Sequence, residues 1–257
     1  ENAAALHAHV RALEDCNQRG GRMLSLIDLI EARTVDLPLA AYLAAAMRGG
    51  ASLLVGARPG GAGKTAVMVA LLNFLPSETR IVPIEGLVVL RRGLQDTAYG
   101  ATCYLAHEIG DSAYYAYIWG EQARLFFQLA GQGHIVATNL HADTLEEMRT
   151  QLCDARGENG VAIADLRAVT LKLFLRVTRG PDFRLRRVVR AVYESPGAGA
   201  EERLVWTGDD RGTYSRQAES VLVSPEVERA HLAFLESLQA RRLRALLDVR
   251  RAVVEDL

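Results

Sequence analysis

The fold is decided by the stretch Ser52-Leu53-Leu54-Val55-Gly56-Ala57-Arg58-Pro59-Gly60-Gly61-Ala62-Gly63-Lys64-Thr65-Ala66-Val67-Met68. In this stretch an apolar run leads into a glycine-rich turn, which is followed by Gly-Lys-Thr and then by an apolar helical pattern. This succession of strand, loop and helix is typical of a phosphate-binding P-loop.

Each part of the loop has a chemical task. Glycines allow backbone N–H groups to point at an anion, and the N-terminus of the following helix adds positive potential. We expect Lys64 to reach the β- and γ-phosphates of a nucleotide and the Thr65 hydroxyl to bind Mg²⁺. The predicted cofactor-binding residues are Gly60, Gly61, Ala62, Gly63, Lys64, Thr65 and Ala66.

Arg58 departs from the usual P-loop pattern, in which a glycine precedes the lysine by six residues. Gly56 stands two residues before Arg58, so we expect a loop that is longer or tighter than usual. The alternative interpretation is a glycine turn followed by a chance Gly-Lys-Thr, and nucleotide binding is the better supported of the two.

Length and composition restrict the class of protein. The 257 residues suffice for one large or two small domains with a real core. A hydrophobic fraction of 49% and a charged fraction of 24% are those of an ordinary soluble globular protein. The formal net charge of −1 argues against a strongly basic surface that binds nucleic acid, so nucleic acid is not an expected partner.

The cysteines and the lack of targeting signals predict a cytoplasmic location. Cys16, Cys103 and Cys153 have no metal-binding spacing and are odd in number, which favours small buried hydrophobic residues in a reducing compartment. No apolar run approaches the roughly 20 residues that span a bilayer, and no secretory or transit signal opens the chain. We therefore expect no membrane insertion, and a cytoplasmic protein or one peripheral to a membrane machine.

Helix and strand signals alternate along the chain. Asp36 is expected to cap one helix, with Pro38 in its first turn, and Thr144 to cap another. Besides the P-loop strand, we predict buried strands over residues 80–85 and 102–108 and further strands over 134–140, 171–177, 187–193 and 203–206. We predict helices over residues 2–18, 24–32, 37–47, 64–74, 113–130, 145–152 and 162–168, and a long charged helix that starts at Ser224.

This alternation predicts an α/β fold with a mostly parallel sheet flanked by helices. Ligands bind at the carboxyl ends of the strands of such sheets, and Lys64, Glu85, Glu108 and His141 all follow strand ends. The predicted domains are an N-terminal helical segment (1–50), a nucleotide-binding domain (51–195), and a C-terminal strand and long helix (196–257), with a linker over 196–200.

Two glutamates are candidate catalytic residues. An apolar strand that ends in a carboxylate, downstream of a P-loop, is what a magnesium-dependent NTPase requires, because the carboxylate orients the attacking water or holds the water shell of the metal. Glu108 is the first candidate for this role, and it joins Thr65 as a predicted metal-binding residue; Glu85 is the second. The alternative is that each glutamate only caps or leaves a strand.

His141 is the third candidate catalytic residue. Its place at the end of a predicted strand suits an imidazole that donates a hydrogen bond to a γ-phosphate. His134 lies at the other end of the same strand, on the order of 20 Å away along an extended chain, which argues against a zinc site made by these residues and His107. A structural role fits His134 equally well.

Four motifs follow one another in a distinctive order. They are Gly63-Lys64-Thr65, Arg80-Ile81-Val82-Pro83-Ile84-Glu85, Leu105-Ala106-His107-Glu108-Ile109 and Gly133-His134-Ile135-Val136-Ala137-Thr138-Asn139-Leu140-His141-Ala142-Asp143. The series resembles the Walker A loop, Asp box, Walker B motif and His box of the type II/type IV secretion ATPase superfamily, the motors of secretion, pili and archaeal flagella. The resemblance covers about residues 24–195, and the tail more faintly, without the N-terminal domain of that family.

The resemblance implies a RecA-like P-loop NTPase core with N-terminal helices and a helical C-terminal tail. It implies ATP and Mg²⁺ as cofactors, and a motor domain that couples ATP hydrolysis to conformational change. The implied partners are further copies of the chain in a homo-oligomer such as a hexamer, with an arginine finger from a neighbouring subunit, and secretion or pilus machinery proteins.

The chain departs from the family pattern in three places. Gly86 stands where the family has Asp, His107 replaces a glycine, and the interval from Glu85 to Glu108 is only 23 residues long, with Arg91 and Arg92 as its only arginines. The altered loop at Arg58, Gly86 and the short interval support an alternative function, a degenerate, non-hydrolysing nucleotide-binding module that acts as an assembly partner.

A third interpretation, a nucleic-acid translocase, draws only on the arginine-rich tail. These arginines are more simply the solvated face of a helix: Arg241, Arg242, Arg244, Arg250 and Arg251.

Overall fold

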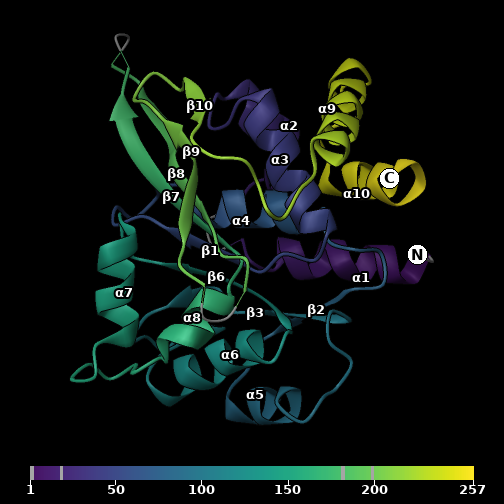
Figure 1. Cartoon of the computed structure of the whole chain (residues 1–257). Coiled ribbons are helices and arrows are strands. Elements are labelled where there is room, and N and C mark those ends of the chain that lie inside the picture. Colours follow the sequence, from purple (N-terminus) through teal and green to yellow (C-terminus); the bar gives the residue numbers. More distant parts are fainter. Residues whose placement is uncertain (1–2, 18–19, 181–182, 198–199) are drawn as a thin grey trace.

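The computed structural model describes residues 3–17, 20–180, 183–197 and 200–257, and within them ten strands form one sheet (Figure 1). The strands are β1 (Leu53–Gly56), β2 (Arg80–Pro83), β3 (Thr102–Leu105), β4 (Glu108–Ile109), β5 (Tyr117–Ile118), β6 (Ile135–Leu140), β7 (Leu171–Arg179), β8 (Leu185–Glu194), β9 (Arg203–Gly208) and β10 (Tyr214–Arg216). The helices are α1 (Ala3–Glu14), α2 (Leu26–Glu31), α3 (Leu37–Arg48), α4 (Lys64–Leu72), α5 (Leu87–Gly93), α6 (Glu121–Gly131), α7 (Leu145–Cys153), α8 (Ile163–Ala168), α9 (Pro225–Ala240) and α10 (Leu246–Asp256).

The centre of the sheet is parallel. The strands β7, β1, β6, β3 and β2 lie side by side in that order and pair in parallel, whereas β8, β9 and β10 continue the sheet beyond β7 as antiparallel strands. Counted along the chain, the parallel strands lie in the order fifth, first, fourth, third, second, which is the order of a RecA-type core. The predicted α/β fold with a mostly parallel sheet flanked by helices is confirmed.

Helices cover both faces of the sheet because the central strands are apolar on both sides. Leu53 and Val55 of β1 pack into a core with α1–α4, α9 and α10, whereas Leu54 between them packs into a second core with α5–α8. Figure 1 shows α5, α6 and α8 on the opposite side of the sheet from α2, α3 and α9. Along the chain of described residues, no helix has the length and apolarity to cross a membrane.

Local capping signals are confirmed. The Asp36 carboxylate accepts a hydrogen bond from the backbone N–H of Leu39 at 2.9 Å, at the start of α3. The Thr144 hydroxyl accepts one from the backbone N–H of Glu147 at 3.1 Å, at the start of α7. Both helices begin where their caps predict, because a cap acts within one turn and needs no tertiary partner.

Two predicted elements are wrong in part. The segment 80–85 is not a buried strand: β2 is the edge strand of the sheet and its residues are exposed or half-exposed. The helix predicted over 113–130 begins only at Glu121, because Gly120 adopts a positive φ of 58° and the preceding aromatic residues form β5 and an exposed turn. Tyr114 in that turn is 70% exposed.

The C-terminal prediction also needs correction. The charged helix that starts after Ser224 ends at Ala240, and a second helix, α10, follows a turn in which Arg242 has a positive φ of 56°. Arg250 is not on a solvated face: it is fully buried and donates hydrogen bonds to the carbonyls of Asn73 and Leu75 at 3.1 and 2.6 Å. This guanidinium therefore ties α10 to the end of α4. Parts of the predicted helix 2–18 and of the linker 196–200 lie outside the described residues.

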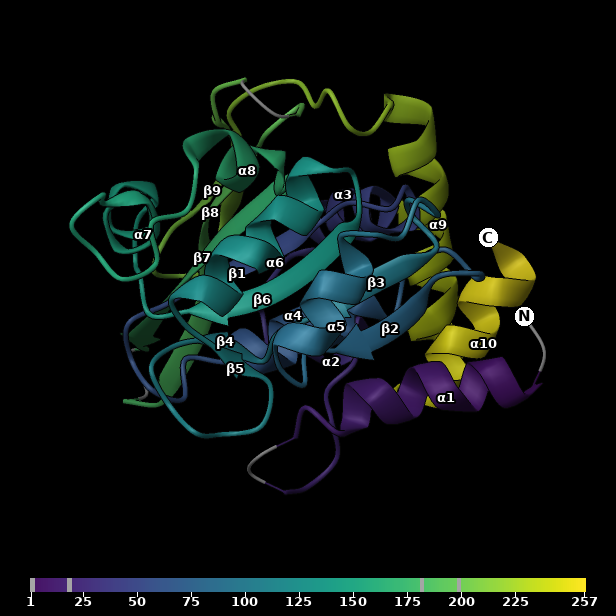
Figure 2. The same cartoon turned by 90° about the horizontal axis from the view of Figure 1, so that it is seen from below.

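His9 makes the stability of this region depend on pH. It lies on α1, which packs against α10 and β2 (Figure 2), and burial together with the charge of Arg250 lowers its pKa to about 3. The unfolded chain, in which the pKa is near 6.5, binds the extra proton between these values, so stability present above pH 6.5 is lost as the pH falls toward 3.

Between pH 7 and pH 4, we expect protonation of His9 to lower the free energy of unfolding of the parent by about 3 kcal/mol. His9→Leu lacks this contribution, so its free energy of unfolding should fall by about 3 kcal/mol less than that of the parent over the same pH range. Urea unfolding at the two pH values measures the difference. His7→Leu, on the exposed side of the same helix, is the control and should behave as the parent. Equal pH dependence in the parent and His9→Leu would contradict the assignment.

Candidate functional site

The glycine-rich loop between β1 and α4 has the backbone that an anion site requires. Gly61 and Gly63 adopt positive φ values of 79° and 93°, which any other residue would adopt only with strain. No side chain of the described residues caps the N-terminus of α4 at Gly63, so none of them takes its first N–H groups in a capping bond. The loop thus fits a phosphate group in both conformation and charge.

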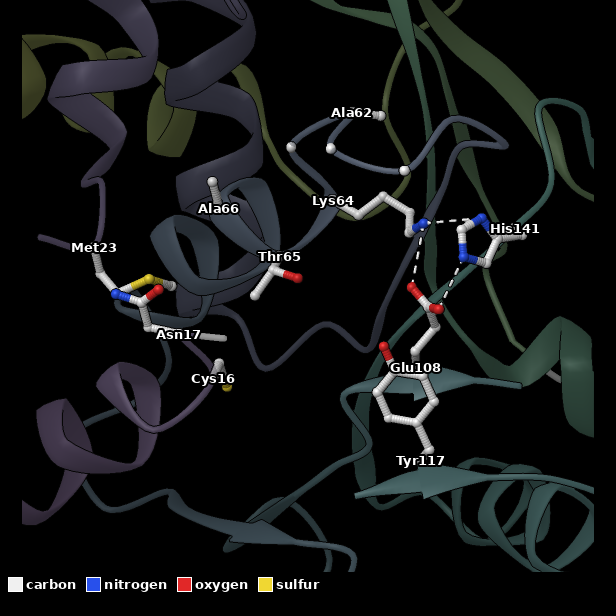
Figure 3. A pocket seen from close by; sticks show the side chains of 13 residues that line it. Cys16, Asn17, Met23, Ala62, Lys64, Thr65, Ala66, Glu108, Tyr117 and His141 are labelled. Atoms are coloured by element: carbon white, nitrogen blue, oxygen red, sulfur yellow. Dashed lines mark hydrogen bonds and ion pairs between the residues drawn. The ribbon is translucent and has the colours of Figure 1, made fainter. Parts of the chain in front are cut away.

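A cavity of about 340 Å³ opens beside this loop (Figure 3). The predicted nucleotide-binding residues 60–66 all line it, and Glu108 and His141 join them from β4 and from the end of β6. The other described residues that line it are Cys16, Asn17, Met23 and Tyr117. The structure therefore gathers the loop, one of the two candidate carboxylates and the candidate imidazole around one space.

Lys64, Glu108 and His141 form a charged cluster at one end of the cavity (Figure 3). The Lys64 ammonium lies 3.2 Å from Glu108 Oε2, and His141 Nε2 lies 2.9 Å from Glu108 Oε1. Lys64 Nζ also donates to the Ala57 carbonyl at 3.2 Å and lies 3.3 Å from His141 Nδ1. Because the side chains of Lys64 and Glu108 are only 7% and 14% exposed, water screens these charges weakly.

Arg58, which breaks the expected loop pattern, ties the loop to α7. Its guanidinium pairs with Glu147 at 2.7 Å, its backbone N–H donates to Asp143 Oδ1 at 2.7 Å, and its carbonyl lies 2.8 Å from His141 Nδ1. The His141 ring is thus held between Glu108 at Nε2 and the Arg58 carbonyl at Nδ1, which sets its orientation. Sequence reasoning missed Asp143 and Glu147 because their partner is far away in the chain.

Arg187 is a second residue that sequence reasoning missed. From β8 its Nε donates to the Gly61 carbonyl at 2.8 Å, and its Cδ lies 3.1 Å from the place where a Cβ on Gly63 would stand. The contact holds the loop from the side of β8, and it makes a side chain at Gly63 costly. Arg91 and Arg92, the arginines that the sequence offered, lie on α5 and do not line the cavity, and Arg91 pairs with Glu121 at 3.1 Å.

Glu85 does not line the cavity. It follows β2, and β6 and β3 separate that edge strand from β1, so its strand end lies away from the loop. Its Oε1 accepts a hydrogen bond from the Tyr115 hydroxyl at 2.6 Å. Desolvation and the neighbouring Glu85 raise the pKa of Tyr115 to about 12, so this phenol stays protonated and keeps donating.

The other histidines lie outside the cavity lining. His134 is buried, its Nε2 lies 3.1 Å from the Asp96 carbonyl, and its ring packs against Tyr99 and Tyr104. His107 packs its ring edge-to-face against Tyr115 at 5.3 Å. In the part of the chain that the structure describes, no three His, Cys, Asp or Glu side chains come together as a metal site.

Comparisons with known proteins show similarity in structure only. No protein-family model matches the chain, and no curated protein matches it. The chain is similar to the X-ray structure of the Legionella pneumophila ATPase DotB, with 14% identity and a TM-score of 0.41 over 90% of this chain and 62% of that one. It is also similar to the Yersinia pseudotuberculosis ATPase DotB, with 13% identity and a TM-score of 0.43 over 83% of this chain and 60% of that one. It thus spans about 60% of the length of these structures.

Proposed function

We propose that the chain binds ATP with Mg²⁺ beside the glycine-rich loop and hydrolyses it. The observation that carries this proposal is the cluster of Lys64, Glu108 and His141 next to the N-terminus of α4. An ammonium that binds phosphate, a carboxylate that activates water and an imidazole that holds this carboxylate suit phosphoryl transfer to water. A contact from His141 to the γ-phosphate would require its Nε2 to leave Glu108.

Binding would draw on both the loop and Lys64. Phosphate oxygens accept hydrogen bonds from the backbone amides of residues 60–66, and the dipole of α4 favours their charge. Lys64 exchanges its contacts with Glu108 and the Ala57 carbonyl for phosphate oxygens. That exchange costs little, because one charge-assisted partner replaces another.

The side-chain oxygens of Thr65 and Glu108 in the cavity also suit a magnesium ion. Mg²⁺ takes few protein ligands and keeps several waters, so the Thr65 hydroxyl with Glu108 acting through water suffices beside the phosphates. When bound, the ion supplies positive charge that offsets the charge of the phosphates.

For hydrolysis we assign the general base to Glu108. A water oxygen attacks the γ-phosphorus, its proton goes to Glu108, and the bond from the γ-phosphorus to the bridging oxygen breaks, so that ADP and phosphate leave. His141 Nε2 holds Glu108 Oε1, which leaves Oε2 for the water once Lys64 has turned to the phosphates. Glu85 would act only indirectly, because it does not line the cavity.

One observation favours the second candidate function, a nucleotide-binding module that does not hydrolyse. Both carboxylate oxygens of Glu108 are engaged, one by Lys64 and one by His141. A cluster that keeps these contacts with nucleotide bound would leave no oxygen to take the proton. Phosphate release from ATP and Mg²⁺ by the parent protein separates the two functions, since only the first gives turnover.

The proposal includes a cytoplasmic homo-oligomer, which the family resemblance makes a hexamer, and which serves secretion or pilus machinery. Each chain would consist of an N-terminal segment (1–50), a nucleotide-binding domain (51–195) and a C-terminal segment (196–257). If a neighbouring subunit completes the site, ATP and Mg²⁺ should shift the chain toward a larger species. Sedimentation velocity with and without nucleotide measures this, and Lys64→Ala is the control that should not respond. A single-chain species at high concentration under both conditions would contradict the oligomer.

A further inference from the structure

The cavity has a second end that differs in chemistry from the charged one. Figure 3 shows Lys64, Glu108 and His141 on one side and Cys16, Asn17 and Met23 on the other, with Thr65 and Ala66 between them. Cys16 and Met23 are 2% and 9% exposed and belong to the hydrophobic core. Among the residues that the structure describes, this second end is therefore a mainly apolar wall with the Asn17 amide.

The wall is held in place by the fold. Cys16 and Asn17 follow α1, which packs against α10 and β2, and Met23 precedes α2. The Asn17 amide donates to the Gly21 carbonyl at 2.7 Å and so joins the two sides of the connecting segment. Burial raises the pKa of the Cys16 thiol to about 12, so the thiol stays neutral, and it donates to the Ala12 carbonyl at 3.6 Å.

The cavity is large enough to hold a ligand bigger than a phosphate group. A volume of about 340 Å³ lies within the range of roughly 300–1,000 Å³ that holds whole small molecules. The negative end of a nucleotide belongs beside Lys64 and the start of α4. Its nucleoside then extends past Thr65 and Ala66 toward the apolar wall.

We propose that Met23, Cys16 and Asn17 form the subsite for the nucleoside, with the flat base against the Met23 thioether and the Cys16 thiol. The inference rests on the proposed nucleotide binding and assigns a role to residues that the sequence left without one. A thioether packs favourably on an aromatic ring, and apolar walls with a few polar groups are typical of small-molecule sites.

Affinities for ATP and for inorganic tripolyphosphate, both with Mg²⁺, separate the two ends of the cavity. Met23→Ala should weaken ATP binding about 10-fold and change tripolyphosphate binding less than twofold. Met148→Ala removes a buried methionine of α7 that does not line the cavity, so it should change neither affinity. Asn17→Ala, at a half-buried position, repeats the test with less risk to folding and should weaken ATP alone.

Loss of both affinities in equal measure, or of neither, in Met23→Ala and Asn17→Ala would overturn the subsite. Lys64→Ala should weaken both ligands, because it acts at the phosphate end. If Lys64→Ala weakens neither ligand, the proposed nucleotide site itself fails, and that result is distinct from failure of the nucleoside subsite alone.

Discussion

Glu108→Gln is expected to lower the rate of phosphate release from ATP by about 100-fold or more and to leave ATP binding unchanged or tighter. The substitution keeps the shape of the side chain and removes the group that takes the proton from water. It also removes a negative charge that opposes the triphosphate at short range, so binding does not suffer. Phosphate release and nucleotide affinity of parent and variant, measured side by side, check both parts.

Glu85→Gln is the matched control for this experiment. It makes the same chemical change in a glutamate that does not line the cavity, so turnover should change little. A clearly active parent whose rate is untouched by Glu108→Gln would defeat the assignment of the base. A parent that binds ATP without turnover would favour the non-hydrolysing module.

Lys64→Ala is expected to weaken ATP binding by about 100-fold, to the point where little affinity remains. Backbone amides and the dipole of α4 alone leave much of the triphosphate charge uncompensated. Titration calorimetry with ATP and Mg²⁺ measures the loss. Wild-type affinity in this variant would contradict the phosphate site.

Lys64→Met keeps the length and packing of the side chain and removes only its charge, so it should lose as much affinity as Lys64→Ala. Thermal unfolding of both variants tests whether the fold persists. We expect it to persist, because His141 still donates to Glu108 at 2.9 Å when the ammonium is gone.

Several features of the fold and the site follow from local sequence. Asp36 and Thr144 start helices where their side chains cap the first turn, and the glycines before Lys64 turn the chain from β1 into α4. The ends of β1 and β6 place Lys64 and His141 at one edge of the sheet, because parallel strands share their carboxyl edge. These interactions act over a few residues, so pattern and spacing suffice to predict them.

The order of the strands in the sheet is decided by tertiary packing, and this order places only one of the two candidate glutamates, Glu108, at the cavity. Both follow strands that point the same way, but the strand of Glu108 lies next to β6 and that of Glu85 lies at the edge. Nothing within either motif distinguishes these positions, because the place of a strand in a sheet depends on which faces the whole chain can bury.

Sequence alone determined the α/β class, the loop and three of the residues that now surround the cavity: Lys64, Glu108 and His141. Only the tertiary structure decided that Arg58 reaches α7, that Arg187 holds Gly61 from β8, and that Arg250 is buried. An arginine has a long side chain that can donate to water, to a carbonyl or to a carboxylate. Its partner is therefore set by which distant segments pack beside it, and that information lies in the packing of the whole chain.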